Sequence, residues 1–292
     1  MNRKRAGRPA PGGYSMKKLL VADIDGTLAH DDHVPEVVAD ACHALVARGW
    51  DMVLATGRIL GSAKKHIIRT GASSITIVYD GARVMDAATG REIWGQKLDP
   101  RVVKDVLEML WDIPWGIQVF RDENVLCKKG DDLAAEYFSK IGVPVDEGLL
   151  FPEPIEGVYR VILYGDPGEV ESAGQRVGAS RLAGECRAVM AGNGFLDILP
   201  SGVSKGAALQ KMISLMQESE RPSIVAAAGD HLNDLEMLRF ADIAITMDDA
   251  RASLREVAHI VLPPASAGGF AHILEPLEEI LSESVSEGSG RK

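Results

Sequence analysis

The chain has 292 residues, of which 46% are hydrophobic and 25% are charged, with a formal net charge of −10. This composition is typical of a globular protein with one large domain or two smaller ones. An acidic surface repels polyanions, so we expect no nucleic-acid partner, and we expect no membrane association.

The two ends of the chain have compositions that seldom pack into a core. Residues 1–15 are basic, rich in Gly and Pro, and lack the apolar segment of a secretory signal, so we expect a disordered tail. Residues 283–292 are polar and are expected to be disordered as well. Met16 is an alternative start. The cysteines are few and lack CxxC spacing, which favours a reducing compartment, and we expect a cytoplasmic protein.

Apolar runs of strand length alternate with helical patterns in the first part of the chain. The predicted elements are a strand at 18–25, a helix at 34–48, a strand at 51–56, a helix at 62–70 and a strand at 74–80. The alternation returns late in the chain, with a helix at 204–217, a strand at 223–230, a helix from Leu232, and strands at 243–247 and 259–263. This order predicts an α/β core with a doubly wound parallel sheet covered on both faces.

The middle of the chain has a different pattern. Its strand candidates mix polar and apolar residues and lie at 90–98, 115–129, 156–166 and 186–200, with helical patterns at 100–110, 132–141 and 169–183. Half-exposed strands with helices predict an α+β layer with one free sheet face. We therefore expect an inserted domain at 83–197, within a core made of 16–82 and 198–282. Its free sheet face could cover a substrate site.

Four short motifs place unusual polar residues where ligands of doubly wound sheets collect, at the carboxyl ends of the strands. The candidates are Asp23 and Asp25 in "DIDGTL", Thr56, Gly57 and Arg58 in "LATGR", Lys205 in "SGVSKG", and Asp230, Asn233 and Asp234 in "GDHLND".

These residue types suit phosphoryl transfer. Acids gathered at one point repel each other unless a divalent cation neutralises them, and hard carboxylate oxygens suit Mg²⁺. Asp23 could then attack phosphorus, while Asp25 carries a proton to the leaving oxygen. Lys205 in a first helical turn opposes the helix dipole, which makes sense if an anion binds there; a solvated surface lysine is the alternative. Thr56 and Lys205 would bind phosphoryl oxygens, and Gly57 would let the backbone come close.

The four motifs, in this order, resemble those of the haloacid dehalogenase-like (HAD) phosphohydrolases. The long insert resembles the Cof-type branch with a type IIB α/β cap. The resemblance implies a Rossmann-like core, Mg²⁺ dependence and a phosphoaspartate intermediate on Asp23. It implies that Asp25 acts as general acid and then base, with its backbone carbonyl on the metal, and that Asp230 completes the ligands. Asn233 and Asp234 would orient the phosphate, the lysine or metal-bound waters, with Asp234 counted among the metal-binding residues.

Some positions depart from the usual pattern of this branch. Asp80 stands where asparagine is common, Asp248 and Asp249 stand where Gly-Asn is common, and residues 266–270 lack the usual acid before glycine. We expect these positions near the leaving group, so the family pattern does not choose the substrate.

Other candidate residues have competing interpretations. His30 and His33 are expected in a solvated loop rather than at a zinc site, and His231 receives no role. Arg58 is assigned to substrate binding, with capping of local carbonyls as an equal alternative. In the insert, five side chains could meet a leaving group, although a charged surface is expected for most: Arg121, Lys128, Lys129, Arg160 and Tyr164. Three tryptophans are expected in the core of the insert: Trp94, Trp111 and Trp115.

The sequence thus predicts a phosphatase for a small phosphomonoester, a sugar phosphate or a related metabolite, as a monomer or homodimer. A sugar phosphomutase is one alternative and would hold an acceptor hydroxyl better than water. A glycosyl-phosphoglycerate or phosphoglycolate phosphatase is a second, which extra cations in the insert would favour. A non-catalytic metabolite-binding regulator is a third, and the intact Asp25 and Lys205 argue against it.

Overall fold

The computed structural model describes residues 17–289 apart from 113–115, 123, 129, 132–135, 137, 139–142 and 193. The described strands form one eight-stranded and one six-stranded sheet. The larger sheet contains β1 (Lys18–Ala22), β2 (Trp50–Ala55), β3 (Ile75–Val78), β4 (Arg83–Asp86), β5 (Arg91–Gly95), β12 (Ile224–Ala228), β13 (Ile243–Met247) and β14 (Ile260–Leu262). Its strand order is β14-β13-β12-β1-β2-β3-β4-β5, and the strands from β14 to β3 are parallel.

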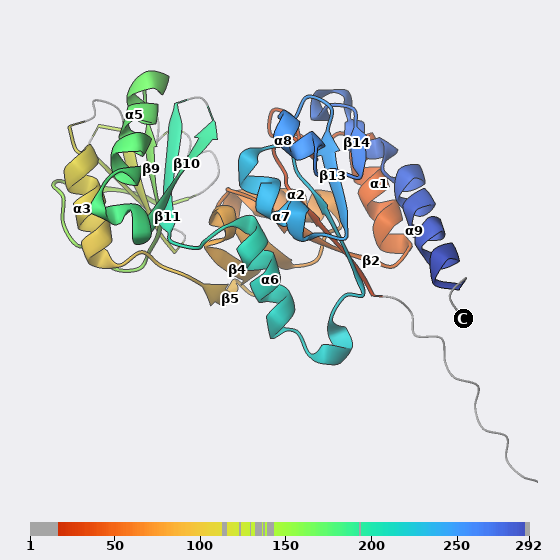
Figure 1. The fold of residues 1–292 in the computed structure, drawn as a ribbon. Helices are drawn as coiled ribbons and strands as arrows, with labels where there is room; N and C mark the ends of the chain where they lie inside the picture. Colours follow the sequence, from red (N-terminus) through yellow and green to blue (C-terminus); the bar gives the residue numbers. More distant parts are fainter. Residues whose placement is uncertain are drawn as a thin grey trace, which may run out of the picture.

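Helices cover both faces of the larger sheet (Figure 1). One face carries α1 (Glu36–Ala47), α2 (Leu60–Thr70) and α9 (Leu274–Ser289), and the other carries α6 (Lys205–Leu215), α7 (Leu235–Phe240) and α8 (Ala252–Arg255). Alternating side chains of β1 show the division, because Leu20 packs with α1 whereas Leu19 and Val21 pack with α6. The predicted doubly wound α/β core is confirmed.

The two strands after β3 extend the larger sheet, although both lie in the range we expected for the inserted domain; β5 falls within the strand predicted at 90–98, whereas β4 was not predicted. β4 pairs antiparallel with β3, and β5 pairs antiparallel with β4. An edge strand is partly exposed, and this exposure produces the mixed polar and apolar pattern that we assigned to the insert. We therefore propose that the inserted segment begins at residue 96 rather than at 83.

The smaller sheet has the order β10-β11-β9-β6-β7-β8 and, with two helices among the described residues, forms the lobe at the left of Figure 1. Its elements are α3 (Pro100–Leu110), β6 (Gly116–Arg121), β7 (Asn124–Lys128), β8 (Val145–Leu149), β9 (Val158–Tyr164), α5 (Pro167–Gly178), β10 (Cys186–Gly192) and β11 (Phe195–Pro200). Both helices pack on the same face of this sheet. The polar strand β8 was not predicted, and the helix expected at 132–141 falls mainly outside the described residues.

The cysteines are buried and free, as expected: Cys42, Cys127 and Cys186. Within the described part of the chain, we find no helix with the length and apolar character needed to cross a membrane.

Candidate active site

Asp23 lies directly after β1, where the carboxyl ends of the parallel strands meet. Its backbone N–H donates to the carbonyl of Ala228 at the end of β12 (2.9 Å), so the two strand ends hold it in place. Its side chain is buried, and the ammonium of Lys205 donates to its Oδ1 at 2.7 Å. Lys205 begins α6, behind the Ser204 cap, and is only 1% exposed. The alternative of a solvated surface lysine is therefore wrong.

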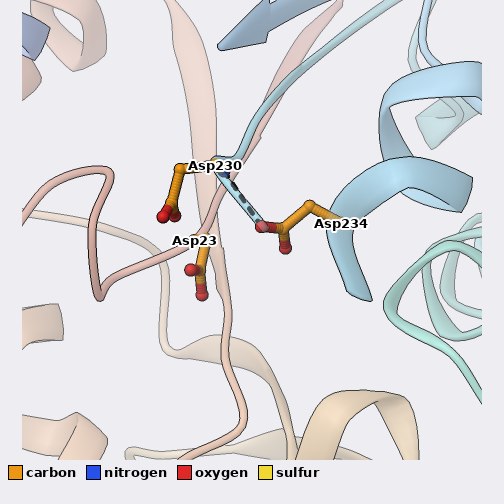
Figure 2. A group of neighbouring side chains, drawn as sticks. All are labelled: Asp23, Asp230 and Asp234. Carbon is orange, nitrogen blue, oxygen red and sulfur yellow. Dashed lines mark hydrogen bonds between the residues drawn. The ribbon is translucent and has the colours of Figure 1, made fainter. Parts of the chain in front are cut away.

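Asp230 and Asp234 come from the loop after β12 and face Asp23 (Figure 2). Asp234 accepts the backbone N–H groups of Asp230 and His231 on Oδ2, each at 3.0 Å, and accepts from Lys205 on Oδ1 at 2.7 Å. One carboxylate oxygen from each of the three acids lies within 4.8 Å of the others. Asp234 therefore holds the loop and the lysine, whereas Asp230 accepts from the Thr27 hydroxyl on Oδ1 at 3.0 Å.

Two glycines allow the backbone to lie against these carboxylates. Gly26 has φ +78°, and a Cβ there would lie 2.2 Å from Oδ2 of Asp230. A Cβ at Gly229 would lie 2.4 Å from Cβ of Asp234. Any larger residue would displace a member of the acidic cluster.

The electrostatics of the cluster favour a bound cation. Burial raises the pKa of Asp23 well above its ordinary value; Lys205 opposes this rise, and the neighbouring acids add to it. Burial likewise raises the pKa of Asp234. Burial also opposes the charge on Lys205, yet Asp23 and Asp234 raise the pKa of this lysine. A cluster with more acids than cations, built from hard oxygen donors, suits a divalent cation.

Asp25 lies apart from this cluster. Its carboxylate accepts from Nε of Arg58 at 2.7 Å, and its side chain is 53% exposed. Arg58 also donates to Asp32, which the sequence reasoning missed. Burial opposes ionisation of Asp32, but hydrogen bonds from Lys65 and Arg58 lower its pKa to about 2. The two acids in contact with Arg58 therefore tie the first motif, through Asp25, and the segment that follows it, through Asp32, to the loop after β2.

Thr56 and Gly57 follow β2, as predicted. The Thr56 hydroxyl is buried and accepts the N–H of Arg58 at 3.1 Å. A Cβ at Gly57 would lie 2.8 Å from Oδ2 of Asp80. Asn233 donates to Oδ1 of Asp80 at 2.8 Å, so the second and fourth motifs meet at this acid.

A cavity of about 710 Å³ lies over these groups, lined by residues of both sheets. Arg160 and Tyr164 line it, whereas Arg121 is exposed and Lys128 lies over the ring of Trp111. Lys129 and Trp115 are outside the described residues.

Six lining residues on the smaller sheet were missed: Gln118, Phe120, Ile162, Met190, Phe195 and Asp197. Their alternation with buried apolar neighbours was the available signal.

Two other residues that the sequence analysis considered lie outside this cavity, whereas His231 lines it. Asp249 and Ser266 line a separate cavity of about 380 Å³ beside Asp230, so they do not line the cavity over Asp23 where we had expected them. His231 contacts Asp230, a contact that the sequence analysis did not expect. Among the described residues, the group that could hold a metal ion consists of Asp23, Asp230 and Asp234.

The family model for haloacid dehalogenase-like hydrolases matches residues 20–274. The chain belongs to this family. An HMP-PP phosphatase from Cronobacter sakazakii is 28% identical over 262 residues, covering 89% of this chain and 95% of that protein. A haloacid dehalogenase-like hydrolase from Bacteroides thetaiotaomicron has a TM-score of 0.75 at 20% identity, covering 89% of this chain and 99% of its own.

A HAD subclass IIB sugar phosphatase has a TM-score of 0.72 at 20% identity, with the same coverage of 89% and 99%. These likenesses show a shared fold. The predicted Cof-type HAD membership is confirmed, and the chain is a phosphatase of this family.

Proposed function

We propose that the chain is a Mg²⁺-dependent phosphatase that hydrolyses a small phosphorylated metabolite through a phosphoaspartate on Asp23. The observation that carries the proposal is the setting of Asp23. Its carboxylate is buried at the end of β1 and accepts a hydrogen bond from Lys205. Asp230 faces it, and it lines the cavity of about 710 Å³. A nucleophile, a phosphate-binding cation and a metal-binding acid are thereby gathered at one point.

Mg²⁺ would be held by the side chains of Asp23 and Asp230 and by the backbone carbonyl of Asp25. Bound there, it would offset the negative charge of the acids and of the phosphate. The sequence analysis counted Asp234 with the metal-binding residues. Its carboxylate already accepts hydrogen bonds from two backbone N–H groups and from Lys205. We assign it the orientation of the lysine and of Asp230.

The residues can divide the reaction into two balanced steps. In the first, an Asp23 oxygen bonds to phosphorus while the bond from phosphorus to the leaving oxygen breaks, and Asp25 gives that oxygen a proton. In the second, water attacks phosphorus, Asp25 takes the water proton, and the bond from phosphorus to Asp23 breaks. Lys205 and Thr56 would bind the phosphoryl oxygens throughout.

The proton carrier must move during this cycle. Asp25 is paired with Arg58 in the structure, and the carboxylate must loosen that pair to reach the leaving oxygen. Arg58 lines the cavity, and its hydrogen bonds to Asp32 and Ser62 would hold it there as Asp25 turns. This supports substrate binding over simple capping as the role of Arg58.

The alternatives differ in what the cavity must supply. A phosphoglycolate or glycosyl-phosphoglycerate needs extra cations, but each Lys or Arg in the described lining already faces a carboxylate: Arg58, Arg160 and Lys205. A mutase would show a phosphoenzyme burst without net phosphate release. Sugar phosphates and HMP-PP are the substrates that the named relatives and structural neighbours suggest for testing. The presence of all the proposed catalytic residues, Asp23, Asp25, Thr56 and Lys205, argues against a non-catalytic regulator.

The first test is phosphate release from an aryl phosphate. We expect activity with Mg²⁺, its loss on addition of EDTA, and a fall in kcat of at least roughly 10³-fold in Asp23→Asn. Equal activity in the native and substituted proteins would remove Asp23 as the nucleophile.

A further inference from the structure

Three charged side chains are buried together where the smaller sheet meets the larger one. Asp197 on β11 is 2% exposed, Arg160 on β9 is 6% exposed, and Asp80, which follows β3, is 5% exposed. Nη1 of Arg160 donates to Oδ2 of Asp197 at 3.2 Å and lies 3.7 Å from Oδ2 of Asp80. We call these three residues the intersheet triad. Two acids share one cation in it, and the extra negative charge is costly inside a protein unless it is neutralised.

The carboxyl group of Asp197 lacks the partners that an ionised group needs. Its Oδ1 is buried and has no hydrogen-bond partner among the described residues. Its neighbours in register, Val189 on β10 and Ile162 on β9, are apolar. An ionised carboxyl can only accept, whereas a protonated one can also donate, and the carboxylate of Asp80 is the acceptor beside it. A proton on Asp197 therefore joins the two acids in one hydrogen bond.

The charges around the triad favour this protonated form. The charged groups that face Asp197 are Arg160 from β9 and Asp80 from the turn after β3. Burial raises the pKa of Asp197 to about 7, with Arg160 opposing the rise and Asp80 adding to it. Burial also opposes the charge on Asp80, but Lys205 and Arg160 lower the pKa of this acid. The proton therefore belongs to Asp197 and the negative charge to Asp80.

The turn that carries Asp80 is strained and touches both elements that we expect to bind phosphate. Tyr79, Asp80 and Gly81 have φ values of +53°, +50° and +100°, a left-handed run that side chains rarely adopt. The N–H of Asp80 donates to the carbonyl of Thr56 at 3.1 Å. A Cβ at Gly81 would lie 2.1 Å from the carbonyl oxygen of Ser204, the cap of α6. Strained backbone persists where the surrounding structure holds it, and it is concentrated at functional sites.

Arg160 joins the triad to the loop after β2. Its Nη1 donates to the carbonyl of Gly57 at 2.5 Å, and a Cβ at Gly57 would lie 2.8 Å from Oδ2 of Asp80. Gly57 directly follows Thr56, which we expect to bind a phosphoryl oxygen. A shift of Arg160 or Asp80 would therefore move the backbone beside the phosphate.

We propose that Asp80 and Asp197 share one proton around Arg160, and that the protonated triad positions the loop after β2 for catalysis. Arg160 and Asp197 are then positioning residues, which act on the phosphate through Thr56 and Gly57. When Asp197 gives its proton to the solvent, two negative charges face each other in the interior, and the hold of Arg160 on Gly57 weakens. The proposal goes beyond the proposed phosphatase function, because it assigns control by pH to residues outside the catalytic set.

The first test is the pH dependence of kcat/KM for an aryl phosphate, in the native protein and in Asp197→Asn. Asparagine can donate to Asp80 and accept from Arg160 at every pH, as a protonated aspartate does. A group with a pKa of about 7 goes from roughly nine-tenths to roughly one-tenth protonated between about pH 6 and about pH 8. Across this range we expect kcat/KM to fall about five- to tenfold more in the native protein than in Asp197→Asn.

The matched control is Asp146→Asn, at an exposed position of β8 in the same sheet, and it should keep the native profile. A fall in Asp197→Asn as large as that of the native protein would overturn the proposal.

A second measurement detects the proton without turnover. Infrared spectra of protein with isotope-labelled aspartate resolve protonated carboxyl groups, and the band missing from Asp197→Asn belongs to Asp197. We expect this band to titrate near pH 7 in the native protein and about one unit lower in Asp80→Asn, which removes the facing charge.

The infrared titration separates the shared proton from the phosphatase function. The expected titration in a protein that hydrolyses no ester would support the shared proton and refute the phosphatase function. Hydrolysis without this titration, or a midpoint that Asp80→Asn leaves unmoved, would overturn the shared proton and leave the phosphatase function standing.

Discussion

Gly26→Ala offers a direct test of the acidic cluster, because the structure provides a matched control. Gly26 and Gly49 have nearly equal backbone angles, φ +78° and φ +79°. A Cβ at Gly49 would meet nothing within 4 Å, whereas a Cβ at Gly26 would lie 2.2 Å from Oδ2 of Asp230. Alanine at either position carries the same left-handed strain of about 1–2 kcal/mol. The two variants therefore differ in the displacement of Asp230.

The size of that displacement follows from the contact distance. Non-bonded heavy atoms are most stable roughly 3.5 Å apart, so the carboxylate of Asp230 must retreat by about 1 Å. A misplacement of about 1 Å at a catalytic group can cost about 10²-fold in rate. We expect Gly26→Ala to lower kcat/KM by about 10²-fold and to raise the Mg²⁺ concentration needed for half-maximal activity, while Gly49→Ala changes neither by more than about twofold.

The assay is a Mg²⁺ titration of phosphate release for the native protein and both variants, with urea denaturation to measure stability. Both variants should lose about 1–2 kcal/mol of unfolding free energy. The reasoning fails if Gly26→Ala retains native kcat/KM and Mg²⁺ dependence, or if the two alanine variants lose activity equally.

Three further outcomes follow from the buried charges. Lys205→Met leaves two buried acids without their cation, and we expect a loss of about 3–5 kcal/mol in urea denaturation, against about 0.5 kcal/mol or less for Lys211→Met on the same helix. Burial, opposed by Arg160 and aided by Asp80, raises the pKa of Asp197 to about 7 from an ordinary value of 3.8. Between pH 3.8 and about 7 the native state keeps a proton that the unfolded chain releases. The free energy of unfolding should therefore fall by a few kcal/mol as the pH rises through this range, and Asp197→Asn should not show this fall. Mg²⁺ should raise the melting temperature of the native protein, an effect that EDTA reverses, because the cation binds only the assembled cluster.

The features that could be predicted from sequence are those decided locally. The apolar run of β1 and the spacing of Asp23 and Asp25 lie within one short segment, and parallel strands bring their carboxyl ends together. β5 was misplaced because an edge strand of the core and a strand of the insert share the same half-exposed pattern. Only the pairing of β5 with β4 distinguishes them.

The cavity wall was harder to predict for a different reason. Alternation along β6 divides Gln118 from Ile117, but it does not say which of the two faces is covered by helices. That choice depends on where α3 and α5 pack, which is a long-range property of the folded lobe. Lining residues of the insert therefore become identifiable only once the helices are placed.

Asp80 shows how a departure from the usual family residue is accommodated. A buried carboxylate needs partners, and Asp80 has Asn233 at 2.8 Å and Nη1 of Arg160 at 3.7 Å. Burial opposes its charge, yet Lys205 and Arg160 lower the pKa of Asp80. Arg160 belongs to the smaller sheet and also donates to the carbonyl of Gly57 in the loop after β2 of the larger sheet. The aspartate thus gives the insert's arginine a charged partner in the core, so the wall that contacts the leaving group is joined to the loop expected to bind phosphate.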